Sequence, residues 1–298
     1  MAALAIWGFW PPVIGVFFMS SNWRLGLGFS LVTAIMWGGL PIALKLVLGE
    51  MDTITVTWFR FSVSAAIALL WYGRRSVAAI KRLFSPPLRP LTLLAMVGLL
   101  ANYILYLVGL DKTTAEAAQI LIQLAPLLLL LGSVFLFREP FSGPQWLGVG
   151  AVAAGLLLFF HHRLRALANL DDDYLLGLLT LVLAAVSWAI YGLAQKRLLR
   201  HVNASDLLLL LYIAGSLCFL PGASPAQVMR LDDLGLAMLI FASLNTIIAY
   251  GSFGLAMTHW EASRVSAVIT LAPLLTLLFV VSINALQAGF MAAEPMDW

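Results

Sequence analysis

The sequence predicts an all-α polytopic membrane protein with ten transmembrane helices, and composition and hydropathy support this. Of its 298 residues, 62% are apolar and only 10% are charged, whereas a soluble domain has about a quarter of its residues charged. The mean hydropathy is +0.98, and the apolar residues form continuous runs, not the alternating pattern of a membrane β-barrel. The remaining length goes into short loops, so no soluble domain is expected.

Each predicted helix is an apolar run of roughly the 20 residues that cross a bilayer core. Charged or turn-forming residues separate the runs, for example Glu50 with Asp52, the Ser-Pro-Pro of residues 85–87 and the Asp171–Asp173 run. In chain order the runs are residues 2–18, 25–47, 53–73, 90–110, 114–137, 144–160, 174–195, 205–221, 234–257 and 262–291.

The charged residues predict how these helices are oriented. If the helix at 25–47 enters from the cytoplasm, most basic side chains fall on the cytoplasmic side, as the positive-inside rule requires. The cytoplasmic set is Arg24, Arg74, Arg75, Lys81, Arg82, Arg89, Arg138, Lys196, Arg197, Arg200 and Arg264. The outer set is Lys45, Lys112, Arg163, Arg165 and Arg230, together with most of the acidic residues. The net charge of +3 therefore gives no indication of nucleic-acid binding.

The chain contains an internal repeat. A shift of 151 superposes Gly26, Ala34, Trp37, Ala43 and Lys45 on Gly177, Ala185, Trp188, Ala194 and Lys196. A shift of 147 superposes Tyr103 and the triplet Leu124-Ala125-Pro126 on Tyr250 and Leu271-Ala272-Pro273. The first copy, residues 22–165, holds five predicted helices. Because five is odd, the second copy, residues 172–298, must enter the membrane with inverted topology, an arrangement typical of transporters with a midplane substrate site.

The second copy has four predicted helices where the first has five. Residues 1–18 hold an apolar helix that lacks the basic region and cleavage site of a signal peptide. Joined to the Glu-Pro-Met-Asp-Trp of residues 294–298, this segment reads like the fifth helix of the first copy. We therefore predict a circular permutation, with residues 1–18 as the displaced tenth helix and both ends of the chain on the outer side. A truncation preceded by an unrelated leader is the alternative.

Three motifs resemble the drug/metabolite transporter superfamily in its ten-helix EamA-type branch. They are the Trp and Lys of the first helix in each copy, the arginine of Trp-Phe-Arg-Phe at 58–61, and the Leu-Ala-Pro of the fourth helix. The resemblance covers residues 22–298 and is nearest to the bacterial exporters of aromatic amino acids and paraquat. It implies a transporter, most specifically an amino-acid exporter, in the bacterial inner (cytoplasmic) membrane.

Polar and aromatic residues near helix centres are the candidate substrate contacts. Gln119 and Gln123 lie four residues apart on one helical face, and their repeat partners Ser266 and Thr270 form a second polar face. Such faces line either a cavity or a hydrogen-bonded helix contact, and central aromatic rings either stack on substrate or pack. The candidates are Trp37, Tyr103, Tyr106, Gln119, Gln123, Trp188, Tyr191, Asn245, Tyr250, Ser266 and Thr270.

Two cations are candidate gate or charge residues. Arg60 lies about 10 Å along its helix at the usual helical rise, so it either contacts a substrate carboxylate, acts as part of a gate, caps backbone carbonyls or snorkels outward. Lys45 ends its helix, where a cation also suits the helix dipole. No Asp or Glu lies in the middle third of any predicted helix. Since proton-coupled transporters bury such a carboxylate, we expect transport without proton coupling.

The resulting prediction is a monomeric exporter of small amphipathic metabolites that works by alternating access, with aromatic amino acids as the preferred solutes. A permease for a drug cation or a nucleotide sugar is the alternative, and a non-transport membrane protein is a more distant one. The expected partners are a small-molecule substrate and the lipid bilayer, without nucleic acid. The single cysteine, Cys218, and the scattered histidines give no metal site, cofactor or enzyme active site.

Overall fold

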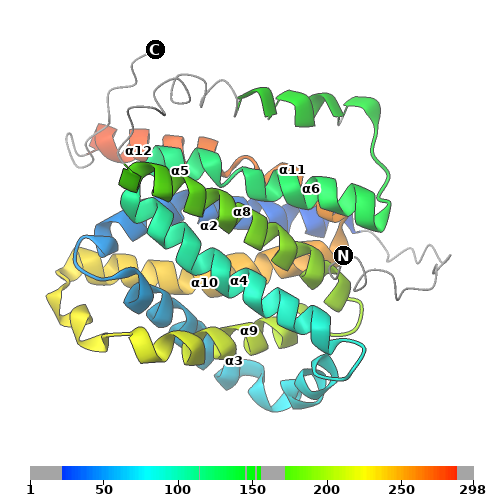
Figure 1. Cartoon of the computed structure of the whole chain (residues 1–298), viewed down its shortest axis with the longest axis horizontal. Coiled ribbons are helices and arrows are strands. Elements are labelled where there is room, and N and C mark those ends of the chain that lie inside the picture. The colour runs from blue at the N-terminus through cyan, green and yellow to red at the C-terminus, as the bar shows by residue number, and fades with distance from the viewer. Residues whose placement is uncertain (1–21, 114, 145, 152, 156–171, 287–298) are drawn as a thin grey trace.

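The protein is an all-helical bundle (Figure 1), seen in a computed structural model that describes residues 22–113, 115–144, 146–151, 153–155 and 172–286. The helices of the first half are α2 (Trp23–Leu48), α3 (Thr53–Leu83), α4 (Arg89–Lys112), α5 (Ala115–Leu121) and α6 (Leu124–Phe137). Those of the second half are α8 (Asp172–Leu198), α9 (Ala204–Phe219), α10 (Asp233–His259), α11 (Ala262–Ile269) and α12 (Ala272–Leu286). Two 3₁₀ turns, Leu220–Gly222 and Pro225–Arg230, join α9 to α10.

The predicted class is confirmed. Within the described ranges, 8 stretches are long and apolar enough to cross a membrane. They are residues 23–48, 53–83, 89–112, 117–137, 173–198, 204–222, 233–259 and 262–283, which coincide with eight of the ten predicted helices. The predicted helix at 144–160 is described only in part. The predicted helix at 2–18, and with it the circular permutation, lies outside the described residues.

The fourth span of each half is broken at the same place. α5 ends at Leu121 and α6 begins at Leu124, whereas α11 ends at Ile269 and α12 begins at Ala272. The first break falls just before a Leu-Ala-Pro triplet, and the second includes the leucine of the equivalent triplet. A proline ring clashes with the carbonyl four residues earlier and removes one helical hydrogen bond, so Pro126 and Pro273 interrupt their helices there.

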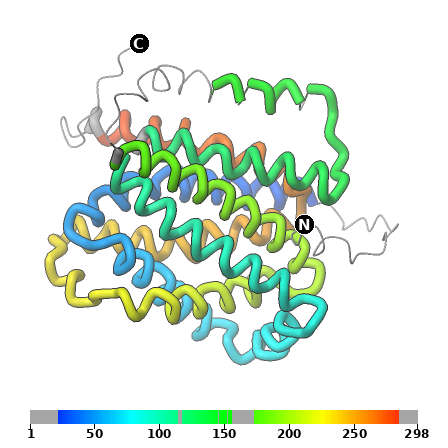
Figure 2. The backbone as a smooth tube through the Cα atoms, viewed as in Figure 1, coloured from blue at the N-terminus to red at the C-terminus, as the bar shows by residue number. Residues whose placement is uncertain are grey.

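The helices of the two halves pack in matched pairs. α2 lies along α10, and α4 lies along α8, as the tube in Figure 2 traces. Thr33 Oγ1 donates a hydrogen bond to the carbonyl of Ala249 at 3.3 Å, and Asn102 Nδ2 donates one to the carbonyl of Ala184 at 3.0 Å. Under the two repeat shifts these are the same pair of positions, so each helix pair has one bond there between the halves, with the donor and acceptor positions exchanged.

Small residues allow equally close approaches in both halves. A Cβ atom at Gly26 would lie 2.6 Å from the Trp260 side chain, and one at Gly177 would lie 2.6 Å from the Thr113 side chain. These positions are again related by the repeat shifts. α3 and α9 pack on each other, with a hydrogen bond of 2.8 Å between Ser62 Oγ and Ser216 Oγ.

The two ends of the bundle differ in charge, as the orientation argument predicts. In Figure 1 the C-terminal ends of α2 and α4 lie on the left, and those of α8 and α10 lie on the right. We call the left end the outer side, since Glu50, Asp52 and Asp111 lie there. The right end, with Arg200 and Arg264, is the cytoplasmic side.

Candidate functional site

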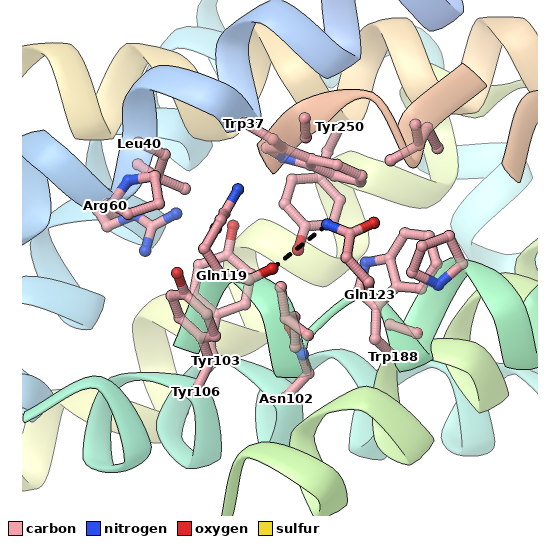
Figure 3. A pocket seen from close by; sticks show the side chains of 16 residues that line it. Trp37, Leu40, Arg60, Asn102, Tyr103, Tyr106, Gln119, Gln123, Trp188 and Tyr250 are labelled. Carbon is pink, nitrogen blue, oxygen red and sulfur yellow. Dashed lines mark hydrogen bonds between the residues drawn. The ribbon is translucent and has the colours of Figure 1, made fainter. Parts of the chain in front are cut away.

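The candidate site is a central cavity of about 100 Å³ between the two halves (Figure 3). Side chains from both halves of the chain form its wall. Eight predicted residues line it: Trp37, Arg60, Tyr103, Tyr106, Gln119, Gln123, Trp188 and Tyr250. The other lining residues are Leu40, Pro41, Asn102, Ile122, Ala125, Pro126, Ile269 and Ala272.

Aromatic rings from equivalent positions meet at the cavity. The ring centroids of Trp37 and Trp188 are 5.5 Å apart, those of Tyr103 and Tyr250 are 5.7 Å apart, and those of Trp37 and Tyr250 are 5.3 Å apart. Two residues that a pseudo-twofold axis exchanges can touch only if both lie near that axis. The two ring pairs therefore mark the centre of the repeat, near mid-depth of the bundle.

Arg60 is a buried cation in the cavity wall. Its side chain is 3% exposed, Nε donates a hydrogen bond of 3.1 Å to Thr246 Oγ1, and the guanidinium carbon lies 4.6 Å from the Tyr103 ring centroid. In the described part of the chain Arg60 forms no ion pair with a carboxylate. Arginine carries five N–H donors, so most of its hydrogen-bonding capacity is open to a bound anion.

Two glutamines add amide groups beside this cation. The break between α5 and α6 leaves Gln123 at the helix junction, with Nε2 3.4 Å from the carbonyl of Gln119. Gln119 Nε2 in turn donates to Thr276 Oγ1 at 3.2 Å. Gln123 Oε1 is buried and accepts no hydrogen bond from the described residues. A donor on a solute, such as an ammonium group, would satisfy it.

The cavity holds no acidic side chain. None of its lining residues is Asp or Glu, and none is acidic among the buried polar residues whose side chains the structure describes. The only charge that reaches the cavity from these ranges is the positive charge of Arg60.

The cavity is displaced from the centre towards the outer side. Leu40 and Tyr106 line it, and both lie beyond the central Trp37 and Tyr103 in the outward direction of their helices. The equivalent residues on the cytoplasmic side are Tyr191 and Phe253, which are 0% exposed and have their ring centroids 6.5 Å apart. Packed rings therefore fill the cytoplasmic counterpart of the cavity.

Five predicted site residues do not line the cavity. Tyr191 belongs to the packed cytoplasmic layer just described. Asn245 Nδ2 donates to the carbonyl of Met36 at 2.5 Å and so joins α10 to α2. Ser266 is buried elsewhere on α11, and Thr270 Oγ1 bonds the carbonyl of Ala267 at 2.7 Å. Lys45 lies one turn outward of the lining residue Pro41.

Lys45 ties two helices together at the outer end. Its Nζ donates hydrogen bonds of 2.9 Å and 3.1 Å to the carbonyls of Leu110 and Thr113, at the C-terminal end of α4. The last carbonyls of a helix have no partner within it, and the cation also suits the helix dipole. The lysine thus stabilises the end of α4, whereas we had expected it to act on its own helix.

Lys196 makes the equivalent tie at the cytoplasmic end. Its Nζ donates hydrogen bonds of 2.7 Å and 2.6 Å to the carbonyls of Met257 and Trp260, at the C-terminal end of α10. The two lysines differ by 151 in number and their four carbonyl partners by 147, so the ties are repeat equivalents. One joins α2 to α4 and the other joins α8 to α10, at opposite ends of the cavity.

Sequence reasoning missed Asn102 and the apolar part of the cavity wall. Asn102 lies directly before Tyr103 in a strongly apolar helix, and a lone amide in such a helix was a usable signal. Ile122, Ile269 and Ala272 carry no such signal. They reach the cavity because the breaks in α5–α6 and α11–α12 turn these positions inward.

Comparison with known proteins identifies the relationship. The model of the EamA-like transporter family matches residues 24–161 and 175–285. An uncharacterized transporter of Haemophilus influenzae is 39% identical over 258 residues, which cover 86% of this chain and 83% of the relative. The uncharacterized inner membrane transporter YhbE of Escherichia coli K12 is 37% identical over 269 residues, covering 88% and 82%.

More distant relatives share the same extent of chain. A protein named probable amino-acid metabolite efflux pump in Escherichia coli K12 is 22% identical over 264 residues, covering 83% of each chain. A protein of known crystal structure has the same fold, with a TM-score of 0.67, 19% identity and 91% of each chain covered. The family and these named relatives are transporters, a class distinct from enzymes. The chain therefore belongs to the EamA-like transporter family and is a multi-pass transporter of the bacterial inner membrane.

Proposed function

We propose that the protein exports small amphipathic metabolites, with aromatic amino acids as the best match, by alternating access and without proton coupling. The observation that carries this proposal is the uneven wall of the cavity. The charged and amide side chains, Arg60, Asn102, Gln119 and Gln123, all come from the first half. The second half contributes Trp188, Tyr250, Ile269 and Ala272.

The repeat itself shows which positions break the symmetry. Asp52 and Asn203 are the N-cap positions of α3 and α9. The same number of residues separates Asp52 from Arg60 and Asn203 from Leu211, so Arg60 and Leu211 occupy equivalent positions. A cation is therefore present in one half only. A wall whose charged and amide groups all come from one half, with aromatic rings from both halves, fits a solute with a polar end and an apolar end, such as an amino acid with an aromatic side chain.

The charge in the wall favours a carboxylate over a cation. The unpaired donors of Arg60 match the planar, two-oxygen geometry of a carboxylate, and Gln123 Oε1, which lies nearer the Trp188 end in Figure 3, offers an acceptor for a donor group on the solute. In Figure 3 Arg60 lies at one end of the cavity and Trp188 at the other, so the ring would extend towards Trp37 and Trp188. A drug cation is disfavoured by Arg60, and a nucleotide sugar would bring more negative charge than one arginine balances.

The cavity in the present conformation is small. A volume of about 100 Å³ corresponds to roughly three water molecules in the liquid, well below the roughly 300–1,000 Å³ of ligand sites. Entry of a solute therefore requires one end of the bundle to open. We assign the gate role to the two lysine ties, with Lys45 holding the outer end closed and Lys196 the cytoplasmic end.

Absence of an acidic side chain from the cavity wall supports uncoupled transport. A carboxylate that exchanges protons during the cycle must be accessible from the substrate path, and its pKa must be raised towards neutral by burial. The described cavity offers none, so the solute's own concentration gradient would provide the driving force.

The test is counterflow of labelled phenylalanine in proteoliposomes that contain the full chain. Phenylalaninamide, which keeps the ring and the ammonium group but lacks the carboxylate, should compete at least tenfold more weakly than phenylalanine. Replacing Arg60 by Gln should remove this discrimination, since a charge-assisted hydrogen bond is worth about 1.5–3 kcal/mol. An imposed pH gradient alone should not concentrate phenylalanine.

The ratio between competition by phenylalanine and competition by phenylalaninamide does not depend on how much of a variant folds. It therefore remains interpretable if Arg60→Gln is less stable. Gln123→Ala and Trp188→Ala should also lower uptake, whereas Trp23→Ala, at a position 51% exposed, serves as the control. Uptake driven by a pH gradient would refute the absence of coupling. Absence of uptake for every amino acid tested would refute the substrate class.

A further inference from the structure

Several buried polar atoms on the cytoplasmic side of the central rings have no hydrogen-bond partner among the described residues. They include Tyr191 Oη, both amide atoms of Gln195 and Ser266 Oγ. The side chains of all three residues are 0% exposed. Leaving buried polar atoms unpaired is costly, and folded proteins seldom tolerate such atoms without a functional reason. Tyr191 and Gln195 lie four residues apart, on one face of α8.

The repeat relates these positions to the open cavity. Under the shift of 151, Tyr191 corresponds to Leu40, and under the shift of 147, Ser266 corresponds to Gln119. Both Leu40 and Gln119 line the outer cavity. Tyr191 and Ser266 thus occupy positions at which a cavity would form if the second half adopted the conformation of the first, and Gln195 lies one turn further along α8 towards the cytoplasm.

In inverted-repeat transporters the two halves exchange conformations during the cycle, so that the cavity opens first to one side and then to the other. Here the cytoplasmic positions are closed by Phe253, whose ring centroid lies 5.1 Å from that of Trp188. The tie from Lys196 to the end of α10 lies further towards the cytoplasm. Gln195 also packs against the backbone of α10, since a Cβ atom at Gly254 would lie 3.2 Å from its Nε2.

We infer that Tyr191, Gln195 and Ser266 line a second, cytoplasm-facing cavity that forms when the Lys196 tie opens, and that they bind the polar end of the transported solute there. This inference rests on the proposed function for the identity of the solute. The tyrosine and serine hydroxyls can donate to a carboxylate, and the amide oxygen of Gln195 can accept from an ammonium group.

Tyr191, Gln195 and Ser266 recognise the solute by uncharged groups. Leu211 occupies the position of Arg60 in this half, and among the three residues there is no ionisable carboxylate or cation. The site therefore suits a zwitterion or a neutral polar solute, bound more weakly than at the arginine. A second, open form also explains the unpaired atoms, because water and solute form hydrogen bonds with them in that form.

The first experiment measures access from the cytoplasmic side. Ser266→Cys is introduced in a Cys218→Ala background, and inverted membrane vesicles are treated with a membrane-impermeant maleimide. The cysteine should react with the reagent in inverted vesicles and not in right-side-out vesicles. Lys196→Met should increase the rate at least tenfold, and phenylalanine should slow it.

The matched control is Ser133→Cys. Ser133 is also a 0% exposed serine on the cytoplasmic half of its helix, but its hydroxyl is bonded to the carbonyl of Leu130 at 2.8 Å. It should remain unreactive in both vesicle types, with or without Lys196→Met. Reaction of both cysteines at similar rates would mean general loosening and would overturn the inference.

The second experiment uses Gln195→Leu, which replaces an unpaired amide by the residue found at the equivalent position, Leu44. If the amide is needed only in the open form, this variant should raise the Tm of the purified protein and lower the rate of counterflow. A lower Tm would indicate a structural role and overturn the inference. Cytoplasmic labelling of Ser266→Cys without protection by any amino acid would keep the cavity but reject the proposed substrate class.

Discussion

Replacing Lys45 by Met should shift the protein towards an outward-open form. The side chain keeps its length but loses both hydrogen bonds to the end of α4, at 2.9 Å and 3.1 Å. α2 and α4 share few other contacts, so Lys45 is a main connection between them at this end. The equivalent tie through Lys196 remains intact and keeps the cytoplasmic end closed.

The size of the shift follows from the bonds that are lost. Hydrogen bonds from a charged donor contribute about 1.5–3 kcal/mol net, and in the open form the ammonium group and the carbonyls bind water instead. Losing one such bond changes the ratio of closed to open protein by a factor of roughly 10–150, and losing both changes it by more. Because the ligand-free protein is closed, the open fraction should rise by a similar factor.

The assay is labelling of a single cysteine in the cavity. Leu40→Cys in a Cys218→Ala background is treated with an impermeant maleimide in right-side-out vesicles. Lys45→Met should increase the rate at least tenfold, and Lys196→Met should decrease it, since that variant favours the cytoplasm-facing form. Lys112→Met is the control, because Lys112 pairs with the exposed Asp173 near the same end of the bundle.

Two results would refute this reasoning. A change of less than twofold with Lys45→Met would show that the tie does not control opening. An equal increase with Lys45→Met and Lys196→Met would show that either loss merely loosens the bundle. The Tm of each variant, measured in parallel, separates loosening from a shift between two stable forms.

Three further predictions concern the framework. Gly109→Ala should destabilise the bundle by about 1–3 kcal/mol, as overpacking does, because its Cβ atom would lie 2.5 Å from Leu181 Cγ. Gly28→Ala, with nothing within 4 Å, should leave the Tm unchanged or raised; equal Tm values for the two variants would contradict this. Burial acts to raise the pKa of Asp52, but hydrogen bonds from Thr55 and Gln227 outweigh it and hold the pKa below its usual value. Its contribution to stability should therefore be present above about pH 4 and be lost as the pH falls through the lowered value, so Asp52→Asn should flatten the acid limb of a plot of Tm against pH. If residues 2–18 are the displaced tenth helix, cysteines placed along them should crosslink to Leu278→Cys on α12, where the Leu278 side chain is 57% exposed. Crosslinking only to α3 or α9 would reject the permutation.

Much of the fold could be read from the sequence because the bilayer imposes a simple rule. A spanning helix must be apolar over about 20 residues, so hydropathy gave eight spans that the structure also has. The repeat could also be recognised from the sequence, since the same residue type recurs at Trp37 and Trp188 and at Tyr103 and Tyr250, each pair at the shift of its segment. These paired residues also pointed to the centre of the molecule, where the rings of both pairs meet.

The sequence by itself determined the membrane class, the spans, the repeat register and most of the polar and aromatic residues at the centre. Only the tertiary structure decided which of two equivalent positions faces the cavity. Leu40 lines it and Tyr191 does not, although Tyr191 was the stronger candidate by residue type. The physical reason is that a repeat in the sequence is symmetric, whereas a closed transporter packs one side of its pseudo-twofold axis more tightly than the other. The same limit applies to Lys45, because the chain alone does not show that its ammonium group reaches the end of α4 across the outer side of the cavity.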